Sequence, residues 1–248
     1  MRVAAIYDIH ANLPALEAVL KDIHEAEVEH IVVGGDVLPG PMPRETIARL
    51  LELDLPVQFI QGNGDREVLA RRRGAETGTV PEQFQEVIRW TAQQLHDEDE
   101  QFLASWPETL RLRIPGLGDV LFCHATPRSD TEIFTRLTPE DGLLPVFEGL
   151  NVPVVVCGHT HMQFDRTIGK TRVLNAGSVG MPFGEPGAYW VLLGPNVQFR
   201  HTRYDLAIAA ERIRQTRYPQ RQDFAERNVL QPPAEEETLK AFAKAELR

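Results

Sequence analysis

The N-terminal quarter of the chain alternates short apolar runs with amphipathic helical patterns, and this alternation constrains the fold more than any other feature. The apolar runs Val3–Tyr7, Ile31–Val33 and Val57–Ile60 have the length and composition of buried strands. Between them, apolar residues recur at helical spacing over 13–23 and 47–51. This β-α-β-α-β order predicts a parallel sheet with helices packed on it.

The second half of the chain is richer in strands. Two runs, 110–114 and 120–123, flank the sequence PGLG and predict a β-hairpin. Residues 81–106 are mostly helical in pattern, and 206–213 resume a helical pattern. Further short strands are predicted at Val152–Cys157, Gln163–Ile168, Thr171–Leu174, Ala188–Leu193 and Val197–Tyr204. Near the C-terminus, residues 218–235 are polar with prolines, which predicts a mobile linker before a terminal helix.

Composition excludes several classes of protein. A net charge of −10 repels the nucleic-acid backbone, so no bulk nucleic-acid binding is expected. The apolar run before Asp8 is too short for a signal peptide, and no run approaches the ~20 residues of a membrane span, so we expect a cytoplasmic protein without a membrane partner. Cys123 and Cys157 each end an apolar run, which predicts buried thiols in a reducing compartment, with a redox pair as the alternative.

Polar side chains directly follow several of the predicted strands. In an open α/β sheet, ligands bind outside the carboxyl ends of the strands, so these side chains converge if the strands share one core. The seven side chains are Asp8, His10, Asp36, Asn63, His124, His159 and His161.

The chemistry of this set indicates a metal site. It holds two carboxylates, four imidazoles and one amide, and no thiolate. Such ligands suit Mn, Fe, Zn or similar divalent ions, and the lack of sulfur argues against a structural zinc site. Seven ligands are too many for one ion with an open position, but they suit two ions ~3.5–4 Å apart that share a carboxylate. Asp36 is the predicted shared ligand, because two glycines before it let the backbone come close.

Each motif has an ordinary explanation when it is taken alone. Asp8 could cap a helix, and a single histidine such as His124 is more often hydrogen-bonded in a core than bound to a metal. The Gly-His-x-His motif is stronger, because His159 and His161 point to the same side if the segment is extended. The joint occurrence of the motifs, in order and each after an apolar run, favours the two-metal interpretation.

The ordered motifs resemble those of the calcineurin-like metallophosphoesterase superfamily, and DIHANLPALEAVL resembles its small prokaryotic phosphodiesterase branch. The resemblance covers roughly residues 1–205, so a metallophosphoesterase domain is expected there. Residues 206–248 are then a helical extension that packs on this domain or trails from it. The motifs are DIH at 8–10, GGD at 34–36, GNGD at 62–65, HA at 124–125, GHTH at 158–161 and NAGSVG at 175–180.

The resemblance implies an α/β fold, a four-layer α/β/β/α sandwich of two mixed β-sheets flanked by helices. It also implies two divalent metal ions, for which we favour Mn over Fe, Zn, Ni or Co. One ion would be bound by Asp8, His10, Asp36 and His161, and the other by Asp36, Asn63, His124 and His159.

The activity that the resemblance implies is hydrolysis of a small phosphate ester, by in-line attack of a hydroxide that bridges the two metals. His10, Asp36 and Asn63 are expected to serve catalysis directly. A phosphodiester is the favoured substrate. The alternatives are a phosphomonoesterase or phosphoprotein phosphatase that uses the same site, and a non-catalytic binding scaffold. An oligomer is compatible with the sequence.

The sequence departs from many relatives at Gly64, where they carry a histidine that assists the leaving group. Loss of such a proton donor could cost ~10²–10⁴-fold in rate. Three explanations stay open. The substrate has a good leaving group, or another residue donates the proton, with His10 the nearest candidate, or this branch needs no acid there.

Residues near the motifs are candidates for substrate binding. Asn175 and Ser178 lie in the NAGSVG segment, which composition alone describes as an ordinary turn and which the resemblance places in a wall of the active site. Arg66 and Arg128 follow motifs and could clamp a phosphate, although a solvent-exposed arginine is the ordinary alternative. Specificity is expected in loops such as 71–106 and 126–150.

Overall fold

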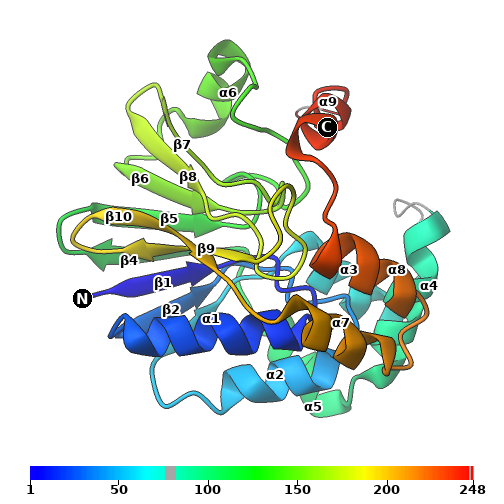
Figure 1. The fold of residues 1–248 in the computed structure, drawn as a ribbon. Coiled ribbons are helices and arrows are strands. Elements are labelled where there is room, and N and C mark those ends of the chain that lie inside the picture. Colours follow the sequence, from blue (N-terminus) through cyan, green and yellow to red (C-terminus); the bar gives the residue numbers. More distant parts are fainter. Residues whose placement is uncertain (76–81, 246, 248) are drawn as a thin grey trace.

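Two five-stranded mixed β-sheets face each other, and helices cover their outer faces (Figure 1). The computed structural model describes residues 1–75, 82–245 and 247. The layered α/β architecture is the one that the sequence resemblance implied, so the predicted fold class is confirmed. Among the described residues, no helix combines the length and the apolar character needed to cross a membrane.

The first sheet combines the three N-terminal strands with the last two strands of the chain. Its order is β10 (Val197–Thr202), β9 (Ala188–Leu193), β1 (Val3–Ile6), β2 (His30–Val33) and β3 (Val57–Phe59). β1, β2 and β3 are parallel, as the β-α-β-α-β pattern predicted. β9 runs antiparallel to β1, and β10 runs antiparallel to β9, which makes the sheet mixed.

The second sheet is built from the middle of the chain. Its order is β4 (Thr109–Ile114), β5 (Gly118–Cys123), β6 (Val154–Cys157), β8 (Thr171–Asn175) and β7 (Phe164–Ile168). β4 and β5 form the predicted antiparallel hairpin. β5, β6 and β8 are parallel, so the carboxyl ends of β5 and β6 lie at one edge of the sheet.

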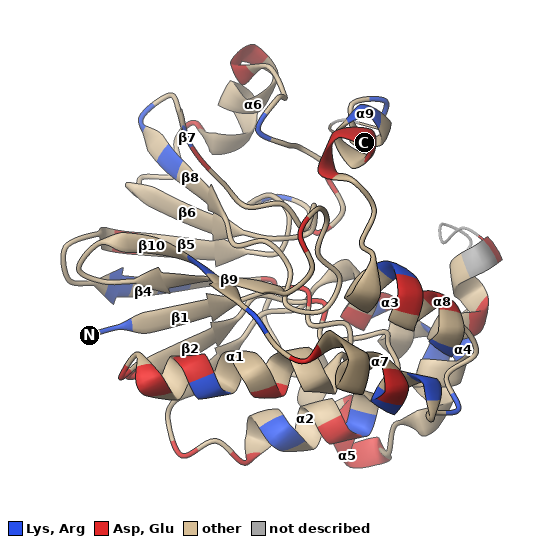
Figure 2. Ribbon diagram, in the orientation of Figure 1, with Lys and Arg blue, Asp and Glu red and all other residues tan. Residues whose placement is uncertain are grey.

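The central strands are buried on both faces, and their alternating side chains divide between two cores. In β1, Val3 and Ala5 pack between the sheets, whereas Ala4 and Ile6 pack against the helices. β6 does the same on the other sheet. Successive side chains of a strand point to opposite faces, so an unbroken apolar run suits a strand between two layers. Figure 2 shows the central strands β1, β2 and β6 in tan, with charged residues concentrated on the helices and loops.

Most of the helices cover the first sheet. These are α1 (Leu13–Glu25), α2 (Pro43–Leu51), α3 (Asn63–Arg72), α4 (Glu82–Gln94) and α5 (Asp97–Ala104). The predicted helical stretch 81–106 is therefore two helices, with a break at Leu95 and His96. On the outer face of the second sheet lies α6 (Glu140–Phe147), which falls in a stretch expected to be a loop. Gly142 and Pro145 obscure this helix in the sequence, but Leu143, Val146 and Phe147 are buried and hold it.

The C-terminal region corrects one expectation. After α7 (Leu206–Arg214), the chain forms α8 (Arg221–Phe224), a π-helical turn η1 (Ala225–Leu230) and α9 (Glu235–Phe242). Tyr218, Phe224 and Val229 are at most 4% exposed and pack in a core cluster with α7 and Val87 of α4. The prediction of a mobile linker over 218–235 was therefore wrong for residues 218–230. The apolar residues are few and lie among charged ones, but their burial fixes the segment.

The two cysteines are free and fully buried, at the ends of β5 and β6, as predicted. Burial raises the pKa of both thiols. They are therefore protonated near neutral pH, and their role in the described structure is packing.

Candidate metal centre

The seven side chains singled out at strand ends lie together in the structure. Asp8, Asp36 and Asn63 follow β1, β2 and β3 of the first sheet, and the histidines at 124, 159 and 161 follow β5 and β6 of the second. Their clustering follows from the sandwich, because the carboxyl ends of these strands lie on the same side of both sheets (Figure 1).

Two backbone segments from different sheets are joined at this point. The backbone N–H of His159 donates a hydrogen bond of 2.9 Å to Oδ2 of Asp8. The hydroxyl of Tyr7, one residue earlier, donates to the carbonyl of Val156 at 3.0 Å. The first sheet and the second sheet therefore fix one another next to the ligand cluster.

Most of the candidate ligands have an unusual backbone. A positive φ is costly for any residue except glycine, at about 1–2 kcal/mol, and such residues gather at functional sites. Neighbouring hydrogen bonds hold the strained segments, such as His10 N–H to Asp36 O at 2.9 Å. Positive φ angles occur at Asp8 (53°), His10 (46°), Asp36 (49°), His159 (65°) and His161 (58°).

This backbone corrects the prediction that the Gly-His-x-His segment is extended. With φ angles of 65° and 58°, His159 and His161 turn instead of alternating along a strand. Their rings reach different neighbours, because His161 lies beside Asp8 and His10, whereas His159 lies beside Asn63 and His124.

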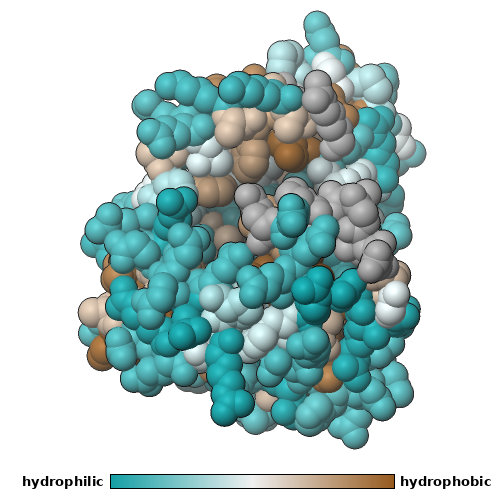
Figure 3. All heavy atoms as spheres, turned by 90° about the vertical axis from the view of Figure 1, so that its right-hand side faces the viewer, coloured by the Kyte–Doolittle hydropathy of each residue, from teal (hydrophilic) through white to brown (hydrophobic). Residues whose placement is uncertain are grey.

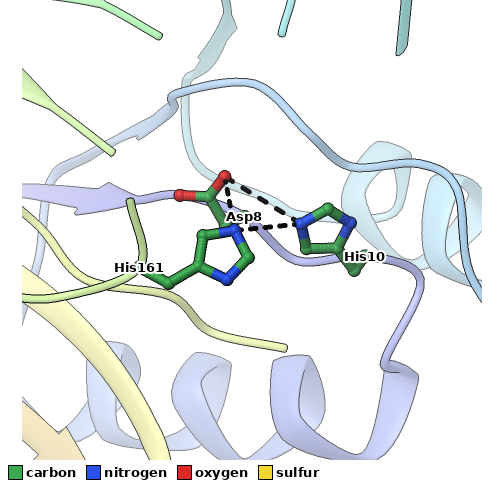
Figure 4. Close-up of side chains that lie close together, drawn as sticks. All are labelled: Asp8, His10 and His161. Carbon is green, nitrogen blue, oxygen red and sulfur yellow. Dashed lines mark hydrogen bonds and ion pairs between the residues drawn. The ribbon is translucent and has the colours of Figure 1, made fainter. Parts of the chain in front are cut away.

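The first group of donors comprises Asp8, His10 and His161 (Figure 4). Nε2 of His161 lies 3.3 Å from Oδ1 of Asp8 and 3.3 Å from Nε2 of His10. Nε2 of His10 is 4.0 Å from the same Asp8 oxygen. The three donor atoms thus lie within 4.0 Å of one another, close enough to bind one ion.

The second group lies beside the first. Nε2 of His124 is 3.5 Å from Oδ1 of Asp36 and 3.8 Å from Oδ1 of Asp8. One amide atom of Asn63 lies 3.1 Å from Nε2 of His124 and 3.1 Å from Nδ1 of His159. Asp36 touches both groups, because its other oxygen, Oδ2, is 3.8 Å from Nε2 of His10.

The outer nitrogens of the histidine rings are held by backbone carbonyls. Nδ1 of His124 donates to Gly34 O at 3.0 Å, Nδ1 of His161 donates to Met181 O at 2.6 Å, and Nε2 of His159 donates to Thr131 O at 3.2 Å. A carbonyl can only accept, so each outer nitrogen carries the proton, and whenever the ring is neutral its inner nitrogen presents a lone pair to the cluster.

Protonation and hydrogen bonding in the cluster fit a divalent cation. Burial lowers the pKa of His10 and of His159 to about 3, so both rings are neutral near pH 7. For His124 and His161, burial is outweighed by the neighbouring Asp36 and Asp8 carboxylates, which raise the pKa. Oδ1 of Asp8 is fully buried and has no hydrogen-bond partner among the described residues. A buried carboxylate oxygen without a hydrogen-bond partner is costly unless a cation lies beside it. The oxygen and nitrogen donor set suits Mn, Fe, Zn and related ions.

Comparison with known proteins gives the family. A family model described as the calcineurin-like phosphoesterase superfamily domain matches residues 1–194. The chain belongs to this superfamily. Among relatives of this calcineurin-like phosphoesterase, an uncharacterized protein of Methanocaldococcus jannaschii is 30% identical over 239 residues, which is 88% of this chain and 94% of that protein.

Two solved structures resemble this calcineurin-like phosphoesterase over most of its length. A hypothetical protein from Pyrococcus horikoshii has a TM-score of 0.77 at 22% identity, and covers 94% of this chain and 99% of its own. A metallophosphoesterase from Sphaerobacter thermophilus has a TM-score of 0.67 at 28% identity, with coverage of 87% and 93%. These likenesses agree with the sandwich described above.

Asn63 is bracketed by glycines because the Asp36 loop approaches closely on both sides. The backbone N–H of Gly64 donates a hydrogen bond of 2.7 Å to Oδ1 of Asp36. A Cβ at Gly64 would overlap Leu38 O and lie 3.0 Å from the same oxygen, and one at Gly62 would also overlap Asp36. In this calcineurin-like phosphoesterase, the backbone therefore leaves no room for a side chain at position 64.

The ring of His10 lies within the first group of donors. Its Nε2 faces Asp8 and His161. A ring nitrogen that ligates a metal cannot donate a proton to a leaving group at the same time. The position of His10 is therefore compatible with the expected ligand role, and a ring that ligates a metal would leave the proton donor to another group.

Asn175 and Ser178 were expected in a wall of the active site, but neither side chain is exposed to a substrate. Both are fully buried. The amide of Asn175 donates to Gly158 O at 2.6 Å, and the hydroxyl of Ser178 donates to Asp8 O at 2.8 Å. They hold the backbone of the ligand loops and offer a substrate no surface, so they are positioning residues here.

The two arginines lie at the rim of the centre, each paired with a carboxylate. Arg66 donates two hydrogen bonds to Asp130, at 2.7 and 3.1 Å, and remains partly exposed. Arg128 pairs with Glu132 in the same bidentate manner. Both arginines line a small cavity of about 210 Å³ that reaches His124.

Asp65 is a functional residue whose role the sequence analysis missed. It is fully buried, and its two oxygens accept hydrogen bonds from Leu38 N at 2.9 Å and Gly62 N at 3.1 Å. Asp65 thereby joins the Asp36 loop to the start of α3. Its place at the third residue of a helix, after a possible capping position, is the signal that could have revealed this role.

Proposed function

We propose that this protein is a phosphodiesterase that depends on two divalent metal ions. The observation that carries the proposal is the convergence of the seven donors into two adjacent groups with Asp36 between them. One oxygen of Asp36 faces His124, and the other faces His10. A carboxylate in that position can serve two ions at once.

The residues present would hold the ions in two sets. Asp8, His10 and His161 would bind one ion, Asn63, His124 and His159 the other, and Asp36 both. When bound, such ions activate a water for attack on phosphorus and offset the charge that develops on the phosphoryl oxygens. Manganese is the favoured metal, with Fe, Zn, Ni and Co as alternatives that suit the same donors.

The chain's own residues orient the phosphate ester. Arg66 lines both cavities beside the centre, and its ion pair with Asp130 holds the guanidinium at the rim. A guanidinium in this place can donate to a phosphoryl oxygen that faces away from the metals. Arg128 lies on the side of His124 and would do the same for the smaller cavity.

A diester is favoured over a monoester for two reasons. The backbone around Gly64 excludes a side chain that would donate a proton to the leaving group, so an ester with a good leaving group suits the site better. The net charge of −10 also disfavours a dianionic monoester relative to a monoanionic diester.

The test is hydrolysis of bis-p-nitrophenyl phosphate with and without Mn²⁺, beside the monoester p-nitrophenyl phosphate. We expect metal-dependent turnover of the diester, faster than that of the monoester. Asp36→Asn should lower turnover at least about 100-fold and reduce the bound metal, because the amide cannot serve two ions as an anion.

A matched control is Asp119→Asn, on an exposed aspartate of β5, which should leave both turnover and metal content unchanged. Full activity of Asp36→Asn would contradict the two-metal site. Faster hydrolysis of the monoester would support the phosphomonoesterase alternative. No metal uptake by the unaltered protein would favour a binding scaffold.

A further inference from the structure

A cavity of about 820 Å³ opens from the candidate metal centre. The ligands His10, Asp36, Asn63, His159 and His161 form part of its lining. Cavities of about 300–1,000 Å³ are typical of sites for small organic ligands. A phosphate group alone would leave most of this volume empty, so the cavity has room for a large ester group.

The apolar part of the remaining wall comes mainly from two segments that are far apart in the sequence. α4 supplies Phe84, Val87 and Ile88, and the C-terminal region supplies Tyr218 and Phe224. The rings of Tyr218 and Phe224 meet edge to face, with centroids 5.9 Å apart. On the face that carries α4 and α8, Figure 3 shows tan and brown atoms in a hollow within a mainly teal surface.

Polar groups also line this cavity, among them Arg66 and Glu67 beside the candidate metal centre. Asp223, Arg227 and Asn228 lie on α8 and η1, and Arg227 Nε is 3.1 Å from Oδ1 of Asp223. An apolar wall with a few hydrogen-bonding groups suits a planar group that has apolar faces and a polar edge.

We infer that the substrate is a phosphodiester in which one ester group is large and planar with a polar edge, the class to which nucleosides belong. This inference rests on the proposed function and assigns the substrate class of the same site. The C-terminal helices, which pack against α4, would thus determine specificity. The net charge of −10 disfavours a polyanion, so the substrate is a small molecule with a single phosphodiester.

The first measurement compares three diesters that share the p-nitrophenolate leaving group. These are the methyl, phenyl and thymidine-5′ esters of p-nitrophenyl phosphate, assayed with Mn²⁺. We expect kcat/KM for the phenyl and thymidine esters to exceed that of the methyl ester by about tenfold or more, because a ring buries apolar area that methyl lacks. Equal values for the three esters would overturn the inference and leave the phosphodiesterase proposal standing.

Phe84 allows a test by substitution, because its side chain is 46% exposed and its removal should not disturb the fold. Phe84→Ala should lower the preference for the phenyl ester over the methyl ester by about fivefold, and Phe84→Leu should retain most of it. The matched control is Phe199→Ala on β10, a phenylalanine that is 37% exposed and does not line the cavity. It should leave the preference unchanged.

A binding measurement separates this inference from the proposed function. Calorimetric titration of the Mn²⁺-loaded protein with diphenyl phosphate and dimethyl phosphate should show tighter binding of the diphenyl ester, weakened about fivefold by Phe84→Ala. This result without any hydrolysis would support the substrate pocket and contradict the catalytic proposal. Equal affinity for both esters, or no effect of Phe84→Ala, would overturn the inference.

Discussion

At the scale of single residues, the loop that carries Asp36 packs so closely against Gly64 that no side chain fits at position 64. The N–H of Gly64 donates to Asp36, and Leu38 O occupies the space where a Cβ would lie. The residue after the ligand asparagine is therefore fixed by packing against the Asp36 loop. A histidine cannot be introduced there without moving this loop.

Gly64→Ala tests this argument. We expect a loss of about 1–3 kcal/mol in the free energy of unfolding, because the new methyl group forces the Leu38 carbonyl away. Turnover of bis-p-nitrophenyl phosphate should fall as well, since Asp36 moves with its loop. Denaturant unfolding and the turnover assay measure the two effects.

Gly142→Ala is the control for this substitution. Gly142 lies in α6, and a Cβ there would make an ordinary contact of 3.4 Å with Leu247. Alanine favours a helix by about 0.5–1 kcal/mol over glycine, so this variant should be as stable as the parent or more stable. If Gly64→Ala also proved neutral in both assays, the packing argument at position 64 would fail.

At the scale of elements, the C-terminal helices are part of the folded body. Tyr218, Phe224 and Val229 bury their side chains against α7 and α4, although charged residues surround them in the sequence. The ring of Trp90, on α4, meets that of Tyr218 with centroids 5.4 Å apart. This contact joins the C-terminal region to the wall of the cavity.

Phe224→Ala should destabilise the protein by about 3–5 kcal/mol, because it removes a buried ring that is 3% exposed. The segment 218–230 should then become sensitive to limited proteolysis, whereas it resists cleavage in the parent. Ile208→Ala, at a position on α7 that is 61% exposed, should change stability by less than about 0.5 kcal/mol. Rapid cleavage of the parent within 218–230 would instead restore the linker interpretation.

At the scale of the whole molecule, the site depends on the two sheets together. The first sheet supplies both carboxylates and the amide, and the second supplies three of the four histidines. The contact between the sheets buries the carboxyl groups of Asp8 and Asp36, and that of the neighbouring Asp65 is buried as well. Burial, followed by the nearby Asp36 carboxylate, raises the pKa of Asp65 to about 8. The stability of the metal-free protein should therefore depend on pH.

The sign of this dependence follows from proton binding. Between about pH 4 and pH 8, folded Asp65 retains a proton that the unfolded chain releases. Its contribution to stability is complete below about pH 4 and is lost as the pH rises towards 8. The free energy of unfolding in the presence of EDTA should thus fall with pH relative to that of Asp65→Asn, in which this titration is absent.

The comparison with Asp65→Asn isolates this effect, because the other buried groups titrate in both proteins. Urea unfolding at pH 5, 6, 7 and 8 provides the measurement. Parallel stability curves for the two proteins would show that Asp65 has the same pKa in the folded and unfolded states.

The sequence by itself predicted the strands, the layered fold through its family resemblance, and the members of the candidate donor set. Unbroken apolar runs such as Val3–Tyr7 are typical of strands buried on both faces, and the polar residues that follow them mark the carboxyl edge of the sheet. Both signals are local, since they depend on the order of residues along a short segment. That is why the sequence alone predicts the strands and the members of the donor set.

Only the tertiary structure decided the finer roles. Asn175 and Ser178 hydrogen-bond to the backbone of the loops that carry the candidate ligands, and Gly64 has no room for a side chain. Phe224 lines the same cavity as His10, which lies near the other end of the chain. Each of these depends on contacts between segments that are distant in sequence. A local pattern describes the backbone and the face of one element, but it does not contain the position of a neighbour that arrives from elsewhere in the chain.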